Sequence, residues 1–137
     1  MRLLIVDDSE IRLQQLRQIV TEIGHEVIGM AKDGQEAVER FRSLHPDAVI
    51  MDLIMPRMNG LDALREILAV DPDANVVIAS SMRSPESALE CERNGARFYL
   101  HKPFDPEMVR SVVAKLAAQL NGKSASELRG AAPDAAG

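Results

Sequence analysis

A chain of 137 residues, 46% hydrophobic and 27% charged, has the size and composition of one globular domain. Its net charge of −5 argues against nucleic-acid binding by this domain, because phosphate contacts need clustered Lys and Arg. No apolar run approaches the ~18 residues of a membrane span, and the single cysteine, Cys91, excludes an internal disulfide. We therefore expect a cytoplasmic protein that does not bind membranes.

Apolar runs and helix-like patterns alternate five times along the chain. The runs LLIV (3–6), AVIM (48–51) and VVIA (76–79) are continuous, which is typical of strands buried on both faces. EVIGM (26–30), with a glycine inside it, and RFYL (97–100) look more like edge strands. This alternation predicts an α/β fold: a doubly wound, five-stranded parallel sheet of flavodoxin-like order 2-1-3-4-5, with five helices.

Capping residues mark the starts of two of the predicted helices. Asp33 followed by Glu36 is a capping-box arrangement, and Ser84 before Pro85 suits a helix cap and first turn. The helix that begins at Pro85 offers few apolar residues, so we expect it to be the least firmly packed of the five.

The last helix and the residues after it form the end of the chain. This helix should begin at Pro106 and end at Asn121 and Gly122, because glycine favours helix ends. Residues 122–137 are rich in Ala, Gly and Ser and have few large apolar residues. We therefore expect a domain of residues 1–121 followed by a flexible tail or linker of residues 122–137.

Charged residues lie where three of the apolar runs stop. Asp7 and Asp8 follow the first run, Asp52 follows the run at 48–51, and Lys102 closely follows the last. The carboxyl ends of parallel strands meet at one edge of a sheet, so these side chains should lie together. Three neighbouring carboxylates repel one another unless a divalent cation joins them, and their hard oxygen atoms suit Mg²⁺. A lysine beside them points to a further anionic group, most simply a phosphoryl group.

A purely structural explanation exists for each of these acids. Asp8 or Ser9 could cap the following helix, and Asp52 could be an isolated loop residue. Ser80, however, ends the fourth apolar run, so four strands each bring a polar residue to the same edge. The complete set favours a functional site over a coincidence of caps.

Four motifs resemble those of the receiver domains of two-component response regulators, and the resemblance covers about residues 2–120. The motifs are VDDS (6–9), MDLIMPRMNG (51–60), IAS (78–80) and HKPF (101–104). The resemblance, to a single-domain chemotaxis regulator in particular, implies a signal-transduction phosphoprotein. Such a protein takes a phosphoryl group from a histidine kinase or a histidine phosphotransfer protein in a phosphorelay.

The resemblance implies roles for the acids and the lysine. Asp52 would be the phosphoacceptor that forms the aspartyl phosphate. Asp8 and Asp52 would bind Mg²⁺ through their side chains, Ile54 through its backbone carbonyl, and Asp7 mainly through water. Lys102 would contact the phosphoryl oxygen atoms. In-line phosphoryl transfer needs positioning and charge neutralisation, which such a set supplies.

The resemblance also implies a set of switch and flanking residues. Ser80 would bind a phosphoryl oxygen and draw its loop inward, and Tyr99 would move into the space that Ser80 leaves. Pro103 would follow a cis peptide bond. Ile54 and Met82 would flank the site, where neither side chain can orient an attacking water.

The output is expected to pass through the fourth helix, fifth strand and fifth helix, by binding a downstream protein or a second copy. One alternative is the receiver portion of a longer regulator with a DNA-binding or enzymatic output domain. An alternative of another class is a Mg²⁺-dependent aspartyl-phosphate phosphatase, but such an enzyme needs a substrate cap. A flavodoxin-like cofactor carrier needs a glycine- and hydroxyl-rich phosphate loop where this chain has two acids. We expect no enzymatic activity beyond assistance to its own phosphorylation and dephosphorylation.

Overall fold

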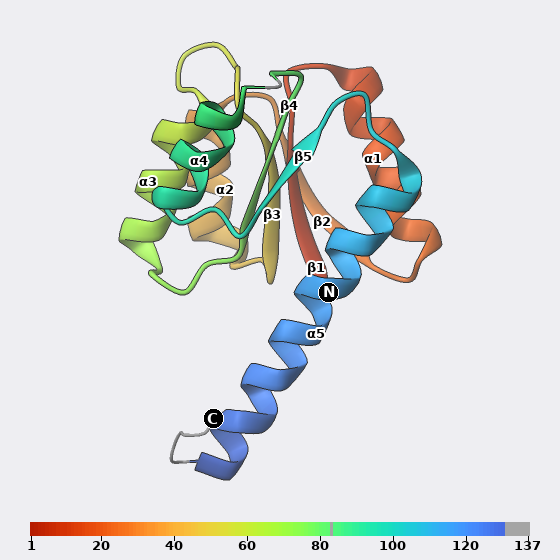
Figure 1. Cartoon of the computed structure of the whole chain (residues 1–137), viewed down its shortest axis with the longest axis vertical. Coiled ribbons are helices and arrows are strands. Elements are labelled where there is room, and N and C mark those ends of the chain that lie inside the picture. The colour runs from red at the N-terminus through yellow and green to blue at the C-terminus, as the bar shows by residue number, and fades with distance from the viewer. Residues whose placement is uncertain (83, 131–137) are drawn as a thin grey trace.

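The computed structural model describes residues 1–82 and 84–130, with only the backbone from residue 121 onward (Figure 1). In this part of the chain, five strands alternate with five helices. They are β1 (Arg2–Val6), α1 (Glu10–Glu22), β2 (Glu26–Ala31), α2 (Gly34–Leu44), β3 (Ala48–Asp52), α3 (Gly60–Val70), β4 (Val76–Ser80), α4 (Pro85–Arg93), β5 (Phe98–His101) and α5 (Pro106–Gly130).

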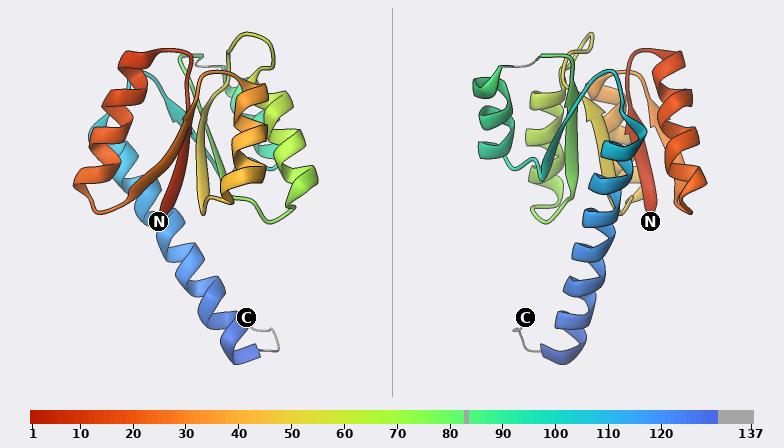
Figure 2. Two further views of the ribbon diagram at one scale, coloured as in Figure 1. Left: turned by 180° about the vertical axis from the view of Figure 1, so that it is seen from behind. Right: turned by 45° about the vertical axis from the view of Figure 1, so that its right-hand side comes forward.

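The strands form one parallel sheet in the order β2-β1-β3-β4-β5, which confirms the predicted fold. Helices α1 and α5 cover one face of the sheet, and α2, α3 and α4 cover the other (Figures 1 and 2). All strands run the same way, so their carboxyl ends share the upper edge of the sheet in Figure 1. The register places Asp52 beside Ala79, and Ser80 beside His101, at that edge.

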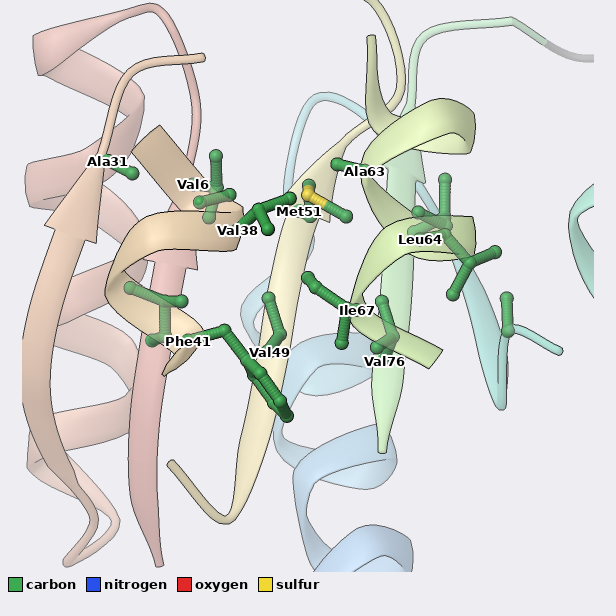
Figure 3. Close-up of a cluster of buried hydrophobic side chains, with 14 of the residues drawn as sticks. Val6, Ala31, Val38, Phe41, Val49, Met51, Ala63, Leu64, Ile67 and Val76 are labelled. Carbon is green, nitrogen blue, oxygen red and sulfur yellow. The ribbon is translucent and has the colours of Figure 1, made fainter. Parts of the chain in front are cut away.

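Alternate residues of the central strands enter two separate hydrophobic cores, because successive side chains of a strand point to opposite faces. Every residue of β3 and β4 is buried. The core under α2 and α3 is drawn in Figure 3, with Phe41 as its large aromatic residue. The core under α1 and α5 contains the other alternate strand residues, among them Leu3, Ile5, Ile50 and Val77.

The predicted helix caps form. The side chains of Asp33 and Ser84 accept hydrogen bonds from the first-turn amides of α2 and α4. Glu36 Oε1 accepts a hydrogen bond from the amide of Lys32 at 2.9 Å, one residue before the position that a capping box uses. Within Pro85–Arg93, Cys91 is the single buried side chain, which confirms that α4 is loosely packed.

The predicted end of the last helix is wrong. Helix α5 continues through Asn121 and Gly122 to Gly130, and it projects beyond the sheet (Figures 1 and 2). One glycine inside a helix costs only about 1 kcal/mol relative to alanine, and the residues after it include Ala, Leu, Glu, Lys and Arg, which favour helix. Residues 131–137 of the expected tail lie outside the described residues.

Candidate functional site

Three carboxylates meet at the carboxyl edge of the sheet. Asp7 and Asp8 follow β1 and Asp52 ends β3, and one oxygen atom from each lies within 4.8 Å of the others. Asp7 and Asp52 are buried, whereas Asp8 is exposed to solvent. Carboxylates this close, with one side open, form a donor set that suits a hard divalent cation such as Mg²⁺.

Lys102 lies between the two buried acids. Its Nζ is 2.9 Å from Oδ2 of Asp7 and 2.9 Å from Oδ1 of Asp52, and the side chain is 8% exposed. Its backbone amide donates to the carbonyl of Ser80, which fixes the loop after β5 against the end of β4. The peptide bond between Lys102 and Pro103 is cis.

The two buried acids differ in their electrostatic surroundings. Burial by itself raises the pKa of Asp7, but hydrogen bonds from Arg12 and Lys102 bring that pKa below its ordinary value. Burial also raises the pKa of Asp52, and Lys102 offsets only part of this effect, so the net shift is upward. Of these two acids, Asp52 is therefore the one whose negative charge is less compensated, and a bound cation would compensate it.

Arg12 belongs to this cluster, although it lies outside the four sequence motifs. Its Nε donates to Oδ1 and Oδ2 of Asp7 at 3.1 and 3.0 Å, and its Nη2 lies 3.4 Å from Oδ1 of Asp8. Arg12 follows Asp8 by four residues, a spacing that brings side chains together on a helix. That spacing was the available signal for it.

The loop after β3 is held close to the strand end. The amide of Gly60 donates to the carbonyl of Leu53 at 2.7 Å, and the amide of Ile54 approaches Oδ1 of Asp52 at 3.4 Å. A Cβ atom at Gly60 would lie 2.3 Å from the carbonyl oxygen of Asp52. The motif MPRMNG therefore ends in glycine because the backbone of Gly60 lies too close to the backbone of Asp52 to leave room for a Cβ atom.

The start of α2 holds the same loop from its other side. The carboxylate of Asp33 is buried and forms an ion pair with Arg57, a residue in the left-handed region at φ 65°. Next to it, the amide of Gly34 donates to the carbonyl of Met58 at 2.9 Å, and a Cβ atom at Gly34 would clash with that carbonyl. Asp33 was expected only as a helix cap, so sequence reasoning missed this contact.

The loop after β4 is held by hydrogen bonds to Met82. The buried Ser80 Oγ accepts from the amide of Met82 at 3.0 Å. The hydroxyl of Tyr99, on the neighbouring strand β5, donates to the carbonyl of Met82 at 3.2 Å and lies 3.5 Å from Ser87 Oγ. Tyr99 is half-buried and packs edge-on against His101. Tyr99 therefore contacts the loop after β4 directly.

A hollow opens to solvent beside Asp52. Its walls combine the charged cluster with Ile54, Ser80, Pro103 and Phe104. The Ile54 side chain is 61% exposed, and Met82 is 42% exposed on the loop after β4. Apolar side chains therefore flank the carboxylate cluster at the surface.

No helix among the described residues combines the length and apolar character needed to cross a lipid bilayer.

A doubly wound parallel sheet with acids and a lysine at the carboxyl ends of its strands has the architecture of a signalling receiver domain. The model of the response regulator receiver domain matches residues 3–114. The chain therefore belongs to the receiver domain family of the two-component response regulators, as its motifs predicted. This membership favours a signalling protein over the phosphatase alternative.

Several characterised relatives share most of this chain. Chemotaxis protein CheY of Thermotoga maritima is 42% identical over 115 residues, which is 84% of this chain and 96% of that protein. The protein-glutamate methylesterase/protein-glutamine glutaminase of the same organism is 40% identical over 105 residues. That match covers 74% of this chain but 30% of the methylesterase, so this type of domain occurs alone and within longer proteins.

Solved structures support the same assignment. The CheX–CheY–BeF3–Mg complex from Borrelia burgdorferi matches with a TM-score of 0.83 and 34% identity, over 85% of this chain and 88% of that chain. The response regulator domain of Thermotoga maritima CheB matches with a TM-score of 0.79 and 33% identity, over 88% of this chain and 96% of that one.

Proposed function

We propose that Asp52 accepts a phosphoryl group from a phosphohistidine of a histidine kinase or a histidine phosphotransfer protein. The observation that carries this proposal is the position of Asp52: at the end of β3, 2.9 Å from Lys102 Nζ and beside two further carboxylates. An oxygen atom of Asp52 attacks phosphorus in line, the bond from phosphorus to the donor histidine nitrogen breaks, and an acyl phosphate forms.

The residues present fit a bound Mg²⁺. The carboxylates of Asp8 and Asp52 would bind it directly, the backbone carbonyl of Ile54 would complete the protein ligands, and Asp7 would act mainly through a water. When bound, Mg²⁺ supplies positive charge to the phosphoryl oxygens. The close, partly open carboxylate cluster supports this assignment, and a CheY structure similar to this chain was solved in complex with Mg²⁺ and BeF3.

Lys102 supplies the second positive charge to the phosphoryl group. In the unphosphorylated protein it forms ion pairs with both buried acids, at 2.9 Å from each. Transfer of the group to Asp52 adds negative charge at the same point, and Lys102 is placed to pair with it. Its role requires positioning and charge more than proton transfer.

The switch is proposed to run from Ser80 to Tyr99. A phosphoryl oxygen on Asp52 would offer the Ser80 hydroxyl an acceptor, and the hydrogen bond from the Met82 amide to Ser80 Oγ would then weaken. Tyr99 holds the carbonyl of Met82 and would follow the loop. Helix α4 has one buried side chain and would shift readily, which changes the face formed by α4, β5 and α5.

That face is proposed to bind a downstream protein or a second copy of the chain. The similar CheY from Borrelia burgdorferi was solved as a complex with CheX. We place the receiver unit at residues 1–121, supported by the family match to residue 114 and the buried Leu116, followed by a tail or linker in which α5 continues as far as Gly130.

Phosphorylation by acetyl phosphate tests the acceptor. With Mg²⁺ present, intact-mass spectrometry should detect one added phosphoryl group on the natural protein and none on Asp52→Asn. Asp71→Asn, which changes an exposed acid after α3, is the matched control and should be modified normally. Acid-labile phosphate on Asp52→Asn would refute the assignment.

A further inference from the structure

Two cations face the three carboxylates of the site, and they are held differently. Lys102 is 8% exposed and reaches both buried acids. Arg12 is 39% exposed, lies in the first turn of α1, and covers Asp7 and Asp8 from the solvent side. Lys102 is therefore enclosed in the site, whereas the Arg12 guanidinium can move into water without leaving a cavity.

The oxygen atoms of Asp7 already accept several hydrogen bonds. Oδ1 accepts from the amide of Ser9 at 2.9 Å and from Arg12 Nε at 3.1 Å. Oδ2 accepts from Arg12 Nε at 3.0 Å and from Lys102 Nζ at 2.9 Å. A metal ion that reached Asp7 directly would have to replace one of these donors.

Asp8 presents the opposite situation. Its side chain is 42% exposed, and its contact with Arg12 Nη2 is longer, at 3.4 Å. Exposed ion pairs of this kind contribute little to stability and break easily. The easiest point of entry for a cation is therefore Asp8, and the group that stands there is the guanidinium of Arg12.

We propose that Arg12 competes with the divalent cation for the carboxylates. In the metal-free protein Arg12 pairs with Asp7 and Asp8, and it must release Asp8 when Mg²⁺ binds. The inference rests on the Mg²⁺ site of the proposed function. Arg12 then has two opposite effects: it stabilises the metal-free fold by offsetting carboxylate repulsion, and it weakens Mg²⁺ binding. It thereby sets the Mg²⁺ concentration at which the site becomes ready for phosphorylation.

Calorimetric titration of the unphosphorylated protein with MgCl₂ tests the competition. Arg12→Gln, which keeps a polar side chain but removes the charge and the guanidinium, should bind Mg²⁺ about threefold to tenfold more tightly. Its thermal midpoint without metal should fall. Arg17→Gln removes the same charge from an exposed position on the same helix, and its Mg²⁺ affinity should stay within about twofold of the natural protein.

Arg12→Lys separates displacement from simple charge. Lysine keeps the charge but loses the planar fork that binds two carboxylates, so its Mg²⁺ affinity should lie between those of the natural protein and Arg12→Gln. In the natural protein, the NMR signal of the Arg12 Nε–H should also move on Mg²⁺ addition, and the Arg17 signal should stay in place.

The outcomes separate the two proposals. Unchanged or weaker Mg²⁺ binding by Arg12→Gln, with binding by the natural protein, overturns the role of Arg12 and leaves the metal site intact. No Mg²⁺ binding by the natural protein or by either Arg12 variant overturns both. Lower stability of Arg12→Gln without tighter binding would make Arg12 a structural ion pair only, which also overturns the inference.

Discussion

The loops that follow β3 and β4 begin at the same edge of the sheet and are held in different ways. The loop after β3 is fixed by backbone hydrogen bonds and close contacts at Gly34 and Gly60, and by the ion pair of the buried Asp33 carboxylate with the exposed Arg57. It carries Asp52 at its start. Neither glycine can be replaced by a larger residue without a shift of this loop, because a Cβ at either position would meet a backbone carbonyl at 2.3 Å.

The loop after β4 is held by side-chain hydrogen bonds instead. Ser80 Oγ and the Tyr99 hydroxyl bind the amide and the carbonyl of Met82, and the loop leads into a helix with one buried side chain. Single hydrogen bonds of this kind contribute about 0.5–1.5 kcal/mol each. A ligand-induced change of a few kcal/mol is enough to rearrange such a loop.

The difference explains how one sheet edge can serve both chemistry and signalling. A nucleophile must be held in place, because small displacements of the reacting atoms slow the transfer. A responding element must have a second arrangement of nearly equal free energy. Asp52 ends the strand that leads into the tightly held loop, and Tyr99 contacts the loop after β4, so the proposed signal passes from the first loop to the second. Four experiments test this contrast.

The largest effect is expected from crowding the rigid loop. Gly60→Ala places a Cβ 2.3 Å from the carbonyl oxygen of Asp52, so the loop must move. We expect the free energy of unfolding to fall by about 1–3 kcal/mol and phosphorylation by acetyl phosphate to slow markedly. Chemical denaturation and mass spectrometry measure these. Gly24→Asn, at a turn with open space around it, is the control; a normal rate for Gly60→Ala would show that the loop is not rigid.

The free energy of unfolding should change in opposite directions when the two buried acids Asp33 and Asp52 are each replaced by Asn. The pKa of Asp33 is lowered: burial raises it, but the Glu36 amide and Arg57 outweigh burial. Its ionised form therefore stabilises the fold above the unfolded pKa, and this stabilisation is lost as the pH falls through the folded pKa. We expect Asp33→Asn to lose about 1–2 kcal/mol of unfolding free energy at pH 7, with the loss shrinking at acid pH.

The pKa of Asp52 is raised by burial, so ionisation of Asp52 costs the folded state stability. This cost is absent below the unfolded pKa and becomes complete above the folded pKa. Without metal, Asp52→Asn should therefore be more stable than the natural protein at pH 7, and the gain should disappear at acid pH. Urea denaturation at several pH values checks both variants. A loss of stability for Asp52→Asn at pH 7 would mean that Lys102 outweighs burial.

Hydrogen exchange should locate the response on the movable side. Beryllofluoride, which stands in for the phosphoryl group, should change amide exchange at residues 81–104 more than at residues 10–45. Tyr99→Phe lacks the hydroxyl that binds the carbonyl of Met82. In this variant, beryllofluoride should change the free energy of amide exchange near β5 by about 1 kcal/mol less than in the natural protein. Ser87→Ala removes only the longer contact of the same hydroxyl and serves as the control. Changes confined to α1 and α2 would place the output face elsewhere.

The smallest effect is expected on the lifetime of the phosphoprotein. Ile54 lines the hollow beside Asp52, and Met82 is exposed on the loop after β4; we expect these apolar side chains to flank the phosphoryl group without orienting an attacking water. The double variant Ile54→Asn, Met82→Glu should shorten the lifetime by about threefold, which is a change of about 0.7 kcal/mol in the barrier to hydrolysis. Release of inorganic phosphate measures it. Leu89→Gln, at an exposed position on α4, is the control. An unchanged lifetime in the double variant would show that Ile54 and Met82 do not limit the access of water to the phosphoryl group.

Much of the fold and part of the site follow from local sequence patterns. Continuous apolar runs marked the buried strands, and Asp33 and Ser84 marked helix starts, because strand burial and helix capping depend on nearby residues. The end of α5 could not be predicted in this way. A glycine near a helix end is a weak signal that the preferences of the following residues can override, and here the helix continues to Gly130.

The sequence by itself determined that Asp7, Asp8, Asp52 and Lys102 would share one edge, because parallel strands bring their carboxyl ends together. Only the tertiary structure decided how these charges pair with their neighbours. The ion pair of Asp33 with Arg57 joins residues 24 positions apart, through the packing of α2 against the loop after β3. Such contacts depend on distances between elements, which are set by side-chain packing across the core and have no periodic signature along the chain.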